Sequence, residues 1–352
     1  MTKPSFQYAS SLLSAAASAA LYATFAATLA IGPMANPAQA TEAGMRTFRT
    51  AAGSNGEAAM PVALYYPTQV AARAIPMGPF TPRVAINGAP DAQVKALIVL
   101  SHGTGGQELV HTTLAEALAR NGYLVAAVRH DGDNYQDQSM MQKPDRYFAE
   151  RPRQLSRVID AVLADPHWKA RIAADASGPR VGALGHSAGG YTVLALAGGM
   201  PDLSRIAAHC NADADDPVFC GMASKIAGGT PVDPAVVLRD PRVRAVAAMA
   251  PLGVMFTASS LASVRIPVTV YGSERNTWLP PRHHAGWASR NIPNSTFQLV
   301  ANAGHFAYSD TPGMAIPTPD GDVGANPAGF DRAAFLGQLS SELVQFFDRT
   351  LR

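Results

Sequence analysis

The chain has 352 residues, of which 47% are apolar and 15% charged, and its formal net charge is +2. This is enough apolar material for one large buried core or two ordinary ones, and it excludes a chain that is disordered throughout. The nearly balanced charge, without a dense run of Lys and Arg, argues against nucleic acid as a partner.

The first forty residues have the pattern of an export signal. Lys3 precedes an uncharged, Ala-rich run over residues 11–31, which is followed by two prolines and a small-residue site at 38–40. This pattern predicts a signal peptide over residues 1–40 that is cleaved after Ala40, with an uncleaved membrane anchor as the alternative. Cleavage would release an exported protein, periplasmic or secreted, without stable membrane association.

From residue 41 onward the sequence predicts alternating strands and helices in a single domain, 41–352. Short apolar runs bounded by Gly and Pro predict strands, and apolar residues at helical spacing predict helices. The predicted strands are 45–50, 61–66, 94–100, 123–128, 180–184, 243–249, 266–271 and 296–300, and the predicted helices are 113–120, 154–164, 188–198, 282–289 and 331–349. This alternation predicts an α/β fold with a mostly parallel sheet covered by helices on both faces.

The segment from about 199 to 240 interrupts the alternation. It is polar and contains proline, and we interpret it as a small cap insertion over the sheet. It also holds both cysteines of the chain, Cys210 and Cys220. In an oxidising compartment these residues can form a disulfide, with two free thiols as the alternative. The ligand spacing of a zinc site is not seen around them, so we predict no metal.

The motif that carries chemistry is Gly185-His186-Ser187-Ala188-Gly189, which matches G-x-S-x-G between a predicted strand and a predicted helix. This context defines a nucleophile elbow, a strained turn that lifts the serine hydroxyl above the sheet. Ser187 is the predicted nucleophile. The backbone N–H of Ala188 is one predicted donor to the oxyanion, and His186 is expected to contact substrate.

The loop over residues 101–106, Ser-His-Gly-Thr-Gly-Gly, follows a buried strand and resembles an oxyanion loop. We predict that the Thr104 N–H is the second oxyanion donor, with Gly105 next in preference, and that Gly103 and Gly105 line the substrate. His130 follows the next strand, at the edge of the sheet where ligands bind in such folds. It is expected either to contact substrate or to hold its own loop.

The base should be a histidine that follows the last strand, and His305 occupies that place. The acid should follow the strand that ends at Tyr271. Glu274 is the carboxylate in that loop, and we predict that it orients His305 and stabilises the imidazolium. A solvated loop position for Glu274, with Asp310 as the acid, is the alternative.

Together these residues resemble the α/β hydrolases known as predicted dienelactone hydrolases, which also look like platelet-activating-factor acetylhydrolases. The resemblance runs from about residue 45 to the C-terminus. Its marks are Tyr65-Tyr66-Pro67, Ser101-His102-Gly103, the loop 130–134, Gly185 to Gly190, Ala250-Pro251 and Gly304-His305-Phe306. It implies the α/β-hydrolase fold and carboxylic-ester hydrolysis. True dienelactone hydrolases use a cysteine nucleophile, whereas this elbow carries a serine, so the family name does not define the substrate.

The function expected from these features is that of a serine esterase, which forms an acyl-enzyme on Ser187 from a small-molecule ester and needs no cofactor. A polyester depolymerase, a peptidase or an acyltransferase would use the same residues. The alternative from another class is a binding protein on this fold whose catalysis has decayed. Acyl size and oligomeric state are left open.

Overall fold

The structure is a computed structural model that describes residues 41–53, 56–212, 215–226, 238–318 and 321–352. The predicted signal peptide, 1–40, therefore lies outside the described residues, as does part of the predicted cap insertion. Residues Ala40–Arg352 form one compact unit. Among the described residues, no helix combines the length and apolar character needed to cross a bilayer.

Ten strands form the main sheet, in the order β12-β11-β10-β9-β5-β6-β2-β1-β4-β3. They are β1 (Glu42–Arg49), β2 (Pro61–Thr68), β3 (Arg73–Ala74), β4 (Arg83–Ile86), β5 (Leu97–Ser101), β6 (Leu124–Val128), β9 (Val181–His186), β10 (Val243–Met249), β11 (Val268–Ser273) and β12 (Ser295–Val300). The six strands from β12 to β6 are parallel, and β2 joins them antiparallel. The predicted α/β fold with a mostly parallel sheet is confirmed.

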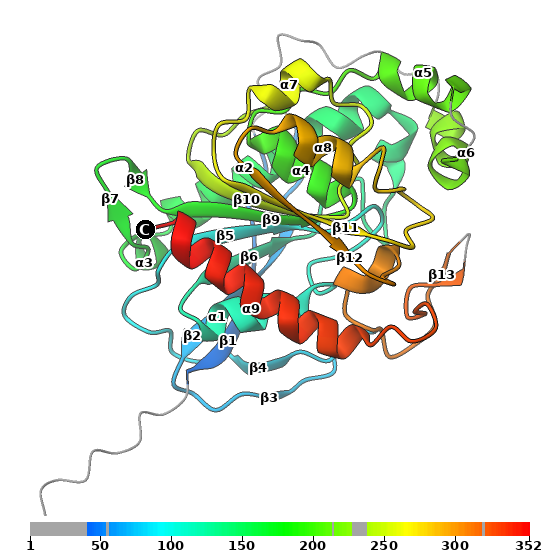
Figure 1. The fold of residues 1–352 in the computed structure, drawn as a ribbon. Coiled ribbons are helices and arrows are strands. Elements are labelled where there is room, and N and C mark those ends of the chain that lie inside the picture. The colour runs from blue at the N-terminus through cyan, green and yellow to red at the C-terminus, as the bar shows by residue number, and fades with distance from the viewer. Residues whose placement is uncertain (1–40, 54–55, 213–214, 227–237, 319–320) are drawn as a thin grey trace, which may run out of the picture. The chain divides into compact units, whose positions relative to one another are not determined.

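Helices cover both faces of this sheet (Figure 1). They are α1 (Thr112–Arg120), η1 (Ser139–Gln142), α2 (Pro144–Ala164), α3 (Pro166–Lys169), α4 (Ala188–Leu196), α5 (Ser204–Ala212), α6 (Pro217–Ile226), α7 (Ala258–Ala262), α8 (Ala285–Asn291), η2 (His305–Tyr308) and α9 (Arg332–Thr350). Two small hairpins add β7 (Ala174–Asp175) with β8 (Gly178–Pro179), and β13 (Pro317–Thr318) with β14 (Gly321–Asp322).

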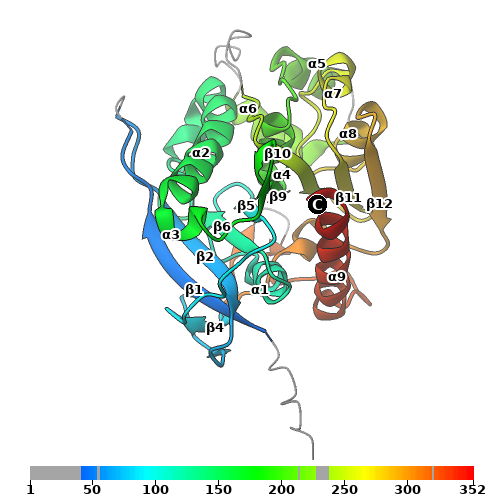
Figure 2. The same ribbon diagram turned by 90° about the vertical axis from the view of Figure 1, so that its left-hand side faces the viewer.

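Alternate side chains of the central strands enter two separate cores. In β5, Leu97 and Val99 pack with α2 and α4, whereas Ile98 and Leu100 pack with α1 and α9. Figure 2 shows α2 and α9 on opposite sides of the strands. Both faces of β5 are therefore apolar, which explains its continuous hydrophobic run.

The structure differs from the prediction most in two segments. Helix α2 begins at Pro144, ten residues before the predicted start at 154. The prediction began too late because Pro152, a residue that usually ends a helix, lies inside α2. The predicted insertion contains two short helices, α5 and α6, in its described part. They are joined by a disulfide between Cys210 and Cys220, whose Cα atoms are 5.5 Å apart, so the predicted disulfide is confirmed and the free-thiol alternative is not.

Candidate active site

Ser187 lies between β9 and α4 in the strained conformation that a nucleophile elbow requires, with φ 57° and ψ −119°. A Cβ on Gly185 would lie 2.1 Å from the Gly189 carbonyl oxygen, and a Cβ on Gly189 would lie 2.0 Å from the Ser101 carbonyl oxygen. Only glycine fits at either position. The close packing of these backbones holds the turn, and Ser187 remains partly exposed.

The structure brings His305 to Ser187. His305 begins η2, and its Nε2 lies 3.0 Å from the Ser187 Oγ. Trp278 stacks on the His305 ring, with 5.5 Å between ring centroids and 13° between planes. His186 is buried and its Nε2 lies 2.9 Å from the His305 carbonyl oxygen, where it donates a hydrogen bond. The prediction that His186 contacts substrate is wrong, because its side chain supports the loop that carries His305.

The prediction that Glu274 orients His305 is also wrong. Glu274 is exposed, and its carboxylate accepts a 2.7 Å hydrogen bond from the Asn302 N–H. The Glu274 N–H in turn donates to the Val300 carbonyl at 3.0 Å. Glu274 therefore ties the loop after β11 to the loop that leads to His305, without reaching the imidazole.

The residue that reaches the His305 ring from this loop is Asn276, whose Oδ1 lies 3.1 Å from Nδ1. Asn276 is buried, three residues beyond the end of β11. Asn276 is not among the predicted residues, because a carboxylate was expected at this position. An amide in the loop after β11, where the acid was expected, is the signal that would have identified it.

Asp310, the alternative acid, has a different role. It lies beyond η2, and its carboxylate accepts hydrogen bonds from the Thr113 N–H, at 3.1 Å, and from the Thr113 hydroxyl. Thr113 is in the first turn of α1, whose N-cap residue His111 makes no side-chain capping bond. Asp310 therefore caps α1 from a distant part of the sequence. Burial raises the pKa of this carboxyl, and the Thr113 bonds oppose that rise.

The predicted oxyanion loop lies directly against the elbow. A Cβ on Gly103 would be 3.2 Å from the Ser187 Cβ, so the backbone at Gly103 faces the nucleophile. The next residue, Thr104, is exposed, and Ala188 is the first residue of α4. Within the described part of the chain, neither the Thr104 N–H nor the Ala188 N–H donates a hydrogen bond. Both are available to an oxyanion formed at Ser187.

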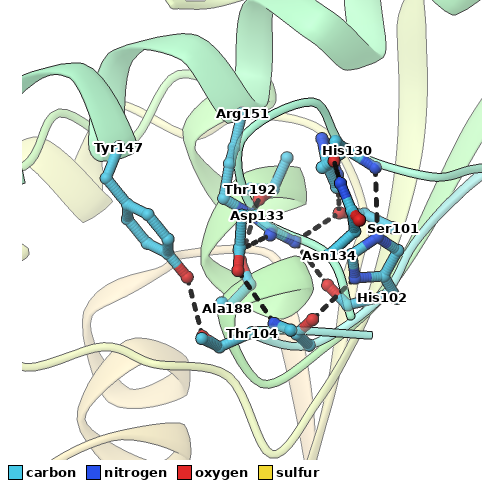
Figure 3. Close-up of polar contacts among 12 residues, drawn as sticks. Ser101, His102, Thr104, His130, Asp133, Asn134, Tyr147, Arg151, Ala188 and Thr192 are labelled. Carbon is cyan, nitrogen blue, oxygen red and sulfur yellow. Dashed lines mark hydrogen bonds and ion pairs between the residues drawn. The ribbon is translucent and has the colours of Figure 1, made fainter. Parts of the chain in front are cut away.

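Gly105 is excluded as an oxyanion donor. Its N–H donates a 2.8 Å hydrogen bond to Oδ1 of Asp133, which is fully buried. The Thr104 hydroxyl is 2.7 Å from the Tyr147 hydroxyl (Figure 3). Asp133 and Tyr147 thus both hold this loop, and Gly105, the second preference for the donor, is wrong whereas Thr104 stays a prediction.

Arg151 is a fully buried cation beneath the oxyanion loop (Figure 3). Its guanidinium pairs with Asp133 and donates to the His102 carbonyl. It also donates to the Ser101 hydroxyl at 3.2 Å and to the Thr192 hydroxyl at 3.0 Å. Thr192 is in α4, so one side chain joins the oxyanion loop to the helix that follows the nucleophile.

His130 belongs to this buried network. Its Nε2 lies 2.8 Å from the Ser101 Oγ, and its Nδ1 lies 2.8 Å from Oε1 of Gln154, which also accepts from the Asp131 N–H. Burial, reinforced by the Arg151 charge, holds the pKa of His130 well below its usual range. A neutral, enclosed imidazole cannot contact substrate, so the second of the two expectations for His130, that it holds its own loop, is correct.

Buried neutral histidines make the fold sensitive to acid. His111 is buried, its Nδ1 lies 2.9 Å from the Tyr308 carbonyl oxygen, and burial lowers its pKa to about 4. Between pH 6.5 and 4 the unfolded chain therefore binds more protons than the folded chain, and stability falls as the pH falls. We expect His111 alone to cost roughly 2 kcal/mol of unfolding free energy between pH 7.5 and pH 5.

Urea unfolding at the two pH values measures this cost. His111→Asn keeps an N–H donor near the position of Nδ1 but does not titrate, so it should reduce the pH dependence by that amount. An unchanged difference between the two pH values in the variant would contradict the assignment.

The described part of the predicted insertion is attached close to the elbow. Asp216 is fully buried, and its Oδ2 lies 2.8 Å from Nε2 of His284 and 2.9 Å from Nε2 of His209. His284 Nδ1 accepts a hydrogen bond from the Gly253 N–H, and the residue before Gly253 donates to the Ser187 carbonyl. Helix α6 also contacts η1. The described part of the insertion therefore packs beside the edge of the sheet that carries Ser187.

Comparison with known proteins supports the assignment of the fold. No protein-family model matches the chain. Cutinase est1 of Thermobifida alba is 26% identical over 217 residues, which are 61% of this chain and 54% of the cutinase, so the match spans about half of that relative. The solved structure of a ferulic acid esterase from Streptomyces cinnamoneus matches with a TM-score of 0.61 and 23% identity, over 90% of this chain and 92% of that one. The chain has the α/β-hydrolase fold.

Proposed function

We propose that this protein is a serine hydrolase that cleaves carboxylic esters through an acyl-enzyme on Ser187. The observation that carries the proposal is the 3.0 Å contact between the Ser187 Oγ and the His305 Nε2 at a strained elbow. A binding protein has no use for a strained serine paired with an imidazole. The likeness to a cutinase and to a ferulic acid esterase agrees with ester hydrolysis.

In the proposed mechanism, His305 removes the Ser187 proton as Oγ attacks the ester carbonyl. The Thr104 and Ala188 N–H groups stabilise the oxyanion, and the imidazolium protonates the leaving alcohol. Water, deprotonated by His305, then releases the acid and regenerates Ser187. The backbone at Gly103 borders the space where the acyl carbon would lie. Every step uses groups of this chain, and none requires a cofactor.

Hydrolysis of p-nitrophenyl esters of increasing acyl length tests this function, together with labelling by a fluorophosphonate. We expect turnover and a label on Ser187. If neither turnover nor label is found, the binding-protein alternative is the better one. Polyester hydrolysis is a second candidate function that is consistent with the cutinase likeness, and release of soluble acid from a polyester film distinguishes it.

The described cap helices are proposed to limit acyl size, because α5 and α6 lie beside the catalytic edge and are joined by the disulfide. Replacing Cys210 and Cys220 by serine should cost about 2 to 3 kcal/mol in the chain-entropy model. With the cap loosened, we expect the ratio of long-acyl to short-acyl kcat/KM to rise. The ester series measures that ratio, and an unchanged ratio in a folded, destabilised variant would contradict the proposed role.

We also propose that the protein is exported after cleavage at Ala40, as either a periplasmic or a secreted enzyme. The Cys210–Cys220 disulfide supports an oxidising compartment. Within serine esterases, the motifs support membership of the group that resembles dienelactone hydrolases and platelet-activating-factor acetylhydrolases. A small-molecule ester, rather than nucleic acid, is the proposed partner.

A further inference from the structure

The orientation of the Asn276 amide is fixed by its own loop. Oδ1 accepts hydrogen bonds from the Trp278 N–H at 3.1 Å and from the Leu279 N–H at 2.9 Å. A flipped amide would present its NH₂ group to both of these donors, which is unfavourable. The atom of Asn276 that lies 3.1 Å from the His305 Nδ1 is therefore the oxygen.

This orientation determines the tautomer of His305. An amide oxygen only accepts hydrogen bonds, so Nδ1 must carry the proton that it donates to Asn276. Nε2 is then left with its lone pair toward the Ser187 hydroxyl, 3.0 Å away. That is the tautomer a general base needs.

We propose that Asn276 is the positioning residue of the catalytic site, a neutral amide that fixes the tautomer and orientation of His305 where many serine hydrolases use a carboxylate. The proposal rests on the proposed function. In a serine protease, replacing the triad aspartate by asparagine lowers kcat about 10⁴-fold because the wrong tautomer forms. Here the Trp278 and Leu279 N–H groups prevent the amide flip that would produce that tautomer.

The surroundings of Asn276 support a role in positioning. It is 5% exposed, and backbone bonds tie its loop to the histidine loop, including one of 2.9 Å from the Arg275 N–H to the Ala303 carbonyl. Among the described residues, its Nδ2 has no hydrogen-bond partner. Replacing the Asn276 amide by a carboxylate of the same shape would therefore remove no hydrogen bond between the described residues. It would add a negative charge next to the imidazole.

Asn276→Ala and Asn276→Asp test the proposal in two independent measurements. In the native protein, ¹⁵N NMR of the His305 ring should show a protonated Nδ1, and Asn276→Ala should lose this preference. The alanine variant should lower kcat by about 10² to 10⁴ with KM changed only a few-fold. The loss of kcat in Glu274→Ala should be at least tenfold smaller than the loss in Asn276→Ala, since the Glu274 carboxylate bonds to the Asn302 N–H and not to the His305 ring.

Asn276→Asp should keep the native tautomer and a kcat at or above the native value. Its negative charge should raise the pKa of His305 and move the rising limb of the pH profile about 1 to 3 units toward higher pH. Asn87→Asp is the matched control. Asn87 is exposed and follows β4, near the opposite edge of the sheet from β11, so the same charge there should leave the pH profile unchanged.

The proposal is overturned if Asn276→Ala keeps both the native kcat and the native tautomer, or if Asn276→Asp is as impaired as the alanine variant. If the proposed function fails, the result is different: the native protein then shows no ester turnover that is lost in Ser187→Ala. The NMR measurement still reports the tautomer in that case, so the two failures are distinguishable.

Discussion

Replacing Ser187 by alanine is expected to lower kcat for a p-nitrophenyl ester by about a millionfold, because no other group at the elbow can form the acyl-enzyme. His305→Ala should cost about as much, since the hydroxyl is a poor nucleophile without its base. The two residues act as a unit, so the double variant should be no worse than either single one.

Initial rates for the three variants and for Ser341→Ala measure these losses. Ser341 is exposed on α9 and bonds only to its own helix, so it controls for the loss of a hydroxyl. Residual activity in Ser187→Ala within tenfold of native would contradict the assignment of the nucleophile.

The second large effect is expected at Arg151, the buried cation beneath the oxyanion loop. Arg151→Met leaves Asp133 buried without its cation, and breaking such a pair costs about 3 to 5 kcal/mol of unfolding free energy. The bonds to the His102 carbonyl and to Thr192 are lost as well, so the oxyanion loop and α4 are no longer joined. We therefore expect kcat to fall more than KM rises in the fraction that remains folded.

Urea unfolding measures the stability loss, and Arg153→Met is the matched control in the same helix. Arg153 is exposed and pairs with Glu150 at the surface, where such pairs contribute roughly 0 to 1 kcal/mol. Replacing Arg151 and Asp133 together by apolar residues should recover part of the stability, because no uncompensated charge then remains. Equal unfolding midpoints for Arg151→Met and Arg153→Met would contradict the role given to Arg151.

Local sequence patterns were sufficient to predict the sheet and the residues, Ser187 and His305, that the structure brings together. The elbow motif identifies Ser187 because Gly185 and Gly189 are needed where two backbone segments pack too closely for a Cβ. The sequence shows these glycines directly. His305 follows from chain order. The alternation of strands and helices is equally local, since β5 reads as a buried run when both of its faces are covered.

The residues that the sequence did not reveal depend on contacts between distant segments. Asn276 is identified by two backbone N–H groups that orient its amide, and no pattern encodes their direction. Arg151 lies in a charged stretch beside Pro152 that reads as surface, yet it is fully buried because Asp133 pairs with it. Glu274 is predicted as the acid from its charge and its place after β11, but neither feature shows that a backbone N–H already occupies its carboxylate.

The proposed reaction requires a covalent acyl-enzyme on Ser187. Brief exposure to an activated acetyl ester, followed by acid quenching, proteolysis and mass spectrometry, would trap it. We expect an acetyl adduct on the peptide that contains Ser187, at the serine itself, and none in His305→Ala on the same timescale. An adduct on another residue, or ester cleavage without any adduct at Ser187 under conditions where a burst is seen, would contradict it.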